Sequence, residues 1–119
     1  MSSLQKRNQY LQHFRNAIHQ GKFPIGTVAY YGPNDQTITK VVAGVLPDDK
    51  TDPILKKWLG EGIAQDPKIA MEIGEFFQKQ KVQKVVMTEG IIGCPHEEGI
   101  DYPSGESCPE CPFWDEAEI

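Results

Sequence analysis

The fold of this chain is decided by residues 25–46, which read IGTVAYYGPNDQTITKVVAGVL. Residues 25–31 and 37–46 are rich in β-branched and aromatic side chains, which are typical of strands. Between them lies Gly32-Pro33-Asn34-Asp35, a strong turn signal because proline presets φ and asparagine tolerates a positive φ. The stretch therefore predicts an antiparallel β-hairpin.

Helical patterns lie on both sides of the hairpin. Residues 3–20 carry apolar side chains three and four positions apart, and Gly21 follows them, which predicts a helix that ends there. Asp52-Pro53 and Asp66-Pro67 each offer an aspartate cap and a proline at the first helical position. These pairs predict a short helix over residues 54–59 and a longer one after Pro67. The apolar stripe of the longer helix consists of Ile69, Ile73, Phe76 and Phe77.

Residues 82–88 predict a third strand, which completes a small sheet. The expected fold class is α+β, with elements in the order α-β-β-α-α-β and the antiparallel hairpin packed on helices. A length of 119 residues indicates a single domain. Within residues 1–119 we expect an α+β core over 1–88, a zinc-binding loop over 89–114 and a flexible tail over 115–119.

The charge of the chain is distributed unevenly. The net charge is −5, but residues 1–34 carry four basic side chains and no acid, whereas residues 85–119 carry nine acids and no Lys or Arg. No apolar run approaches the roughly 20 residues that span a bilayer, and the N-terminus has no apolar signal-peptide core. We therefore expect a cytoplasmic protein without membrane contact, whose three cysteines stay reduced.

The chemistry of the chain is concentrated near its C-terminal end. Cys94, His96, Cys108 and Cys111 have the spacing C-x-H-x₁₁-C-x-x-C. Thiolate and imidazole are the preferred ligands of tetrahedral zinc, and Cys-Pro-Glu-Cys is a good half-site because two intervening residues let both sulfurs face one ion. The pattern predicts a structural zinc site.

His96 is the weakest ligand of the set, because a single residue separates it from Cys94. If His96 did not bind, a fourth ligand could come from Asp101, water, His13 or His19. An open position would permit a zinc-dependent enzyme, a hydrolase or a deaminase-like protein, with Glu97 or Glu98 as its base. This remains an alternative to the closed site.

Two further interpretations of the cysteines fit less well. His96-Glu97 together with Cys108 and Cys111 matches part of the zinc deaminase signature, but Ser107 stands where that signature has proline, and Cys94 is left over. A dithiol redox motif would need a helix N-terminus to stabilise the thiolate, whereas proline and acidic residues surround this one. The acidic side chains of the loop are interpreted as a solvated surface. They are Glu89, Glu97, Glu98 and Asp101.

The basic side chains of the first helical segment form a candidate partner surface. They are Lys6, Arg7, Arg15 and Lys22. Nucleic-acid binding through them is possible but disfavoured, because the sequence pI is about 5.1 and a zinc centre with three thiolates adds about one further negative charge. A protein partner with an acidic surface, or a second copy of the chain, is favoured.

The stretch from Val85 to Trp114 resembles a family of small, uncharacterised prokaryotic proteins that end in a similar CPHEEG-DYP-CPxCPFW tail. Residues 25–33 are also similar to that family's hairpin. The resemblance implies that Cys94, His96, Cys108 and Cys111 act as one unit, and it implies no reaction. The sequence thus predicts a zinc-stabilised protein-interaction or regulatory module without catalytic activity.

Overall fold

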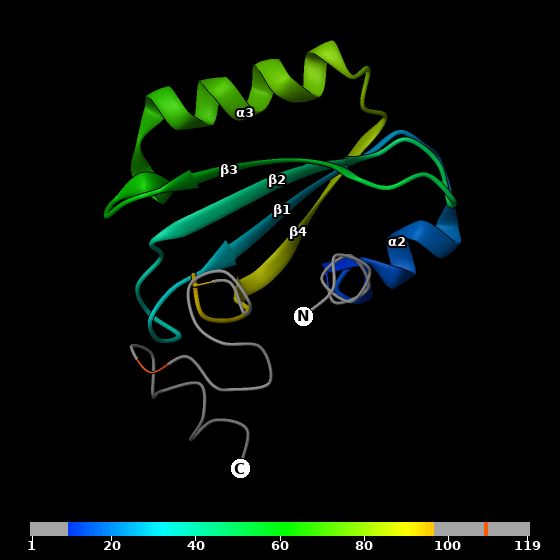
Figure 1. Cartoon of the computed structure of the whole chain (residues 1–119). Helices are drawn as coiled ribbons and strands as arrows, with labels where there is room; N and C mark the ends of the chain where they lie inside the picture. Colours follow the sequence, from blue (N-terminus) through cyan, green and yellow to red (C-terminus); the bar gives the residue numbers. More distant parts are fainter. Residues whose placement is uncertain (1–9, 97–108, 110–119) are drawn as a thin grey trace.

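The computed structural model describes residues 10–96 and Pro109 of the chain (Figure 1). The fold is α+β, as predicted, with a four-stranded sheet in the order β3-β2-β1-β4. Strands β2 and β3 each pair antiparallel with their neighbour, whereas β4 runs parallel to β1. The elements are α2 (Arg15–Gln20), β1 (Ile25–Tyr31), β2 (Lys40–Leu46), β3 (Ile54–Leu59), the 3₁₀ turn η1 (Ile63–Gln65), α3 (Pro67–Lys79) and β4 (Lys84–Ile91).

The predicted hairpin is confirmed. Strands β1 and β2 pair from Ile25↔Leu46 to Tyr31↔Lys40 without a break. In the connection, the Asn34 side chain accepts hydrogen bonds from the backbone N–H groups of Gln36 and Thr37, at 2.8 and 2.9 Å. Strand β2 begins at Lys40 rather than at the predicted Thr37, whose own N–H is taken up by this asparagine turn.

The short helix predicted over residues 54–59 is wrong, since these residues form strand β3. The strand pairs with β2 from Lys40↔Leu59 to Val45↔Ile54. The outer edge of β2 carries backbone groups that need partners, and a third strand satisfies them. A helix of fewer than two turns would gain too few hydrogen bonds to compete. The observed order of elements is therefore α-β-β-β-α-β, with η1 between β3 and α3.

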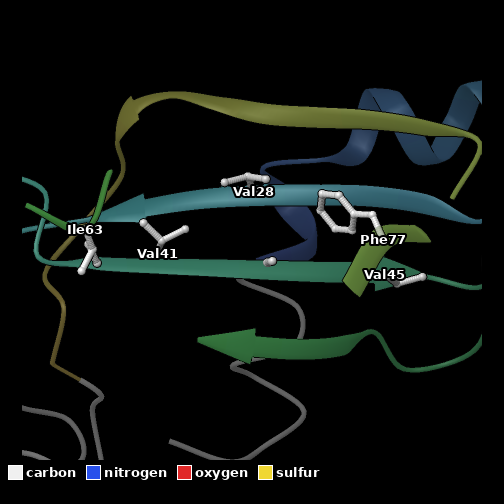
Figure 2. Close-up of a cluster of buried hydrophobic side chains, with 6 residues drawn as sticks. Val28, Val41, Val45, Ile63 and Phe77 are labelled. Atoms are coloured by element: carbon white, nitrogen blue, oxygen red, sulfur yellow. The ribbon is translucent and has the colours of Figure 1, made fainter. Parts of the chain in front are cut away.

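Helix α3 covers one face of the sheet (Figure 1). It begins as predicted, with Asp66 accepting a hydrogen bond from the Lys68 N–H at 2.9 Å and Pro67 at the first position. Figure 2 shows Phe77 of α3 over the strand valines of the main hydrophobic cluster. Gly26 permits this contact, because a Cβ there would lie 3.2 Å from the Phe77 ring. The buried cluster consists of Val28, Val41, Ala43, Val45, Ile63 and Phe77.

The N-terminal helical segment covers the opposite face. Tyr10, Phe14 and Ala17 are buried there against the side chains of β1 and β2 that point away from α3. The described part of the predicted helix has a turn at residues 13–14, and α2 follows it. As predicted, α2 ends at Gly21, whose N–H bonds the Ala17 and Ile18 carbonyls. Residues 3–9 of the predicted helix lie outside the described residues.

The two edge strands leave apolar side chains exposed. Ile54, Leu55 and Leu59 on β3 are 42%, 49% and 64% exposed, and Val85 and Met87 on β4 are about half exposed. Strand β4 runs from Lys84 to Ile91, so it extends beyond the predicted end at residue 88. Within the described residues, no helix is long and apolar enough to cross a bilayer.

A buried hydrogen bond joins the N-terminal segment to the sheet. The Tyr10 and Thr27 hydroxyls lie 2.6 Å apart, and Thr27 is fully buried. Burial raises the pKa of the Tyr10 phenol well above its ordinary value, because the charged form loses its hydration.

We predict that Tyr10→Phe lowers the free energy of unfolding by about 1–3 kcal/mol, because the Thr27 hydroxyl is left buried without this partner. Adding Thr27→Val to that variant should recover most of the loss, since both partners are then apolar. Urea unfolding followed by circular dichroism measures both effects. Tyr30→Phe is the control, because Tyr30 lies on β1 like Thr27 but on the opposite face of the sheet. It should change the free energy of unfolding by less than about 0.5 kcal/mol.

The raised pKa of Tyr10 also predicts a pH dependence. The unfolded chain ionises this phenol near its ordinary pKa of 10.0, whereas the folded chain keeps it protonated to higher pH. The stabilisation is therefore complete below pH 10 and is lost as the pH rises beyond it. Between pH 8 and pH 11, the wild-type protein should lose more stability than Tyr10→Phe; equal losses would contradict the burial of this phenol.

Candidate metal centre

The backbone that follows β4 continues the ladder with β1. The N–H of Ile92 donates to the Tyr30 carbonyl at 2.9 Å, and the N–H of Gly32 donates to the Gly93 carbonyl at 2.9 Å. Because β1 and β4 are parallel, their carboxyl ends meet at the same edge of the sheet. Cys94 is therefore placed directly beyond the end of β1, beside the connection of the hairpin.

Cys94 and His96 form a compact pair at this edge. The Cys94 Sγ lies 3.3 Å from the His96 Nδ1, and the backbone N–H of His96 donates to the same sulfur at 3.3 Å. A tetrahedral zinc with one sulfur and one nitrogen ligand holds these two atoms about 3.5 Å apart, given bonds of about 2.3 and 2.0 Å. An N–H donor to the sulfur also stabilises a ligating thiolate. The two side chains thus fit half of a zinc site.

The turn between these two residues is held by the start of β2. The Lys40 ammonium donates to the carbonyl of Pro95 at 3.2 Å and lies 5.4 Å from the centre of the Tyr31 ring. Lys40 is only 5% exposed. The half-site is therefore tied to β1 through the backbone and to β2 through a buried side chain.

The other predicted ligands lie outside the described residues. These are Cys108, Cys111 and the alternative ligand Asp101, and the proposed bases Glu97 and Glu98 lie outside as well. Among residues 10–96 and Pro109, no group of three or more His, Cys, Asp or Glu side chains gathers around one point. His13 and His19 are exposed on the N-terminal helical segment. The described chain accordingly contains one half of the predicted ligand set.

The structure places two of the four predicted partner-surface residues. Arg15 and Lys22 are exposed, at the start of α2 and just beyond its end, while Lys6 and Arg7 lie outside the described residues. Arg15 lines a shallow, open and mainly polar hollow with Gln12, His13 and Asn16. The described part of the candidate surface therefore faces solvent.

Lys40 is the residue that the sequence interpretation did not single out. Its one signal is positional: a lysine opens a strand that otherwise reads VVAGVL. Such a lysine is usually solvated, because a charged side chain is rarely buried. Only the return of the chain after β4 brings the Pro95 carbonyl to it.

No family model, curated protein or solved structure matches this chain. The interpretation of the site therefore depends on its own geometry. That geometry brings one thiol and one imidazole together and fixes the turn that carries them.

We predict that the reduced protein binds one equivalent of zinc. Cys94→Ser, His96→Ala, Cys108→Ser and Cys111→Ser should each weaken binding by more than the roughly 10–100-fold expected for residues next to a ligand. Competition against a chromophoric chelator measures the affinity. His13→Ala and His19→Ala are matched controls and should bind as the wild type does. Undiminished binding by His96→Ala would contradict the closed four-ligand site.

Proposed function

We propose that this protein is a small, zinc-stabilised protein-interaction module without catalytic activity, and that it binds an acidic protein surface. The main support for zinc binding is the distance of 3.3 Å between the Cys94 Sγ and the His96 Nδ1. Zinc bound by this pair together with Cys108 and Cys111 would stabilise the fold of residues 89–114, which have few apolar side chains of their own.

The ligand set supports a structural rather than a catalytic metal. Three cysteines and one histidine complete a tetrahedron, whereas catalytic zinc sites keep one position for water. The His96 ring lies close to the Cys94 sulfur, as a ligand of the same ion would. The C-x-H-x₁₁-C-x-x-C spacing supports treating the four residues as one unit. With no open position, neither Glu97 nor Glu98 has a bound water to activate.

Charge supports the acidic partner. Residues 1–34 carry four basic side chains and no acid, and Arg15 and Lys22 are exposed among them. The rest of the protein is acidic, which opposes binding to a polyanion as dense as nucleic acid. A protein surface with a few carboxylates matches a few exposed cations better than a phosphate backbone does.

We predict that the zinc-loaded protein binds fluorescently labelled poly-glutamate at low salt, measured by anisotropy. Arg15→Glu combined with Lys22→Glu should weaken this binding by about tenfold, because two exposed ion pairs of up to about 1 kcal/mol each are lost. Lys68→Glu is the matched control, since Lys68 is exposed on α3 at the opposite face of the sheet, and it should bind as the wild type does.

A mixed-sequence RNA in the same assay separates the nucleic-acid alternative. If the RNA binds more tightly than poly-glutamate, with a steep salt dependence that the double variant reduces, the protein-partner proposal is wrong. If neither polymer binds, the proposed use of the basic surface is wrong. Zinc that stays bound in His96→Ala together with a titratable water would instead favour the zinc enzyme.

A further inference from the structure

Lys40 is a charged residue at the start of an otherwise apolar strand. It is the first residue of β2 and is 5% exposed, although the rest of the strand is apolar. Burying an ammonium group costs several kcal/mol unless it is well paired, and an apolar side chain of similar size is often equally stabilising at such a position. The partners of the Lys40 ammonium therefore decide what this side chain contributes to the fold.

Two contacts of Lys40 lie at the candidate metal half-site. Its ammonium donates to the carbonyl of Pro95, the single residue between the two ligand positions, at 3.2 Å. In the register of the hairpin, Lys40 is opposite Tyr31, and its ammonium lies 5.4 Å from that ring. Tyr31 and Ile92 both pack against the cluster of Tyr10, Phe14, Ala29 and Val42, and Gly93 lies beside the Tyr31 ring. One side chain thus bonds the turn whose conformation sets the separation of Sγ and Nδ1.

The charge of Lys40 also suits a zinc centre of this composition. A zinc ion with three thiolates and a neutral imidazole has a net charge of about −1. Such a centre is stabilised by a nearby cation, and more so where water is excluded. Residues that hold and polarise ligands from outside the coordination shell commonly change metal affinity by about 10–100-fold.

We propose that Lys40 is a positioning residue for zinc: its ammonium fixes the Pro95 carbonyl, sets the close approach of Cys94 to His96, and balances the negative charge of the loaded site. This inference rests on the proposed zinc function. It adds that the metal loop is bound to the hairpin through β2, so that zinc affinity depends on a residue more than fifty positions away in the sequence.

The test uses the full-length chain with three substitutions. Lys40→Met removes both the charge and the hydrogen bond, whereas Lys40→Gln keeps a hydrogen-bond donor without the charge. Lys84→Met is the matched control, because Lys84 is also a part-buried strand lysine whose ammonium donates to a backbone carbonyl, that of Ala17 at 3.3 Å. Zinc affinity is measured by chelator competition, the absorption bands of the Co²⁺-loaded protein report the ligand geometry, and urea unfolding without metal reports stability.

We expect Lys40→Met to weaken zinc binding by about 10–100-fold and to shift the cobalt bands, with Lys40→Gln between it and the wild type. Lys84→Met should keep wild-type affinity and bands. Unchanged affinity and bands in both Lys40 variants, in a wild type that binds zinc, would overturn the role of Lys40 and leave the zinc proposal standing. A wild type that binds no zinc would overturn both. If Lys40→Met does not fold, Lys40→Gln decides the question alone.

Discussion

The structure depends on the position of β1, which has a strand at each edge and a helical layer on each face. Its hydrogen bonds run to β2 on one side and to β4 on the other. Residues of β1 that point to α3 meet Phe77, and those that point the other way meet Tyr10 and Phe14. A strand enclosed on every side is mostly apolar, which is why residues 25–31 of β1 read as a nearly continuous apolar run, with the hydrogen-bonded Thr27 as its buried polar residue. Strand β2, which also lies inside the sheet, is apolar over residues 41–46.

The same enclosure explains how much of the fold could be predicted. The hairpin and α3 were predictable because their signals are local: a turn at Gly32-Pro33, an aspartate cap at Asp66 and a stripe at helical spacing. Strand β3 could not be predicted, because its six residues fit both a helical and a strand pattern. The outer edge of β2, which needs backbone hydrogen-bond partners, selects the strand. The Asp52-Pro53 pair is also an ambiguous signal, because the φ of proline suits an extended chain as well as the first turn of a helix.

The candidate site divides in a similar way. The sequence singles out Cys94 and His96 by their chemistry and spacing, and in the structure the Cys94 Sγ and His96 Nδ1 lie 3.3 Å apart. The role given to Lys40 could not be predicted, because it depends on parallel pairing between β1 and β4. That pairing returns residue 95 to the start of β2 after the chain has passed through β3 and α3. The spacing of residues in the sequence indicates which side chains can bind the same metal ion. Which distant side chain contacts those residues depends on the topology of the sheet.

Strand β3 has one further consequence, which concerns solubility. An exposed edge with unpaired backbone groups and apolar side chains is a template for pairing with another sheet. On β3 the exposed Ile54, Leu55 and Leu59 are interrupted by Lys56 and Lys57 at the centre of the strand. A second copy of β3 aligned antiparallel on this edge would place like charges next to each other, which destabilises the pairing. The two lysines at its centre therefore make this edge a poorer template for a second sheet.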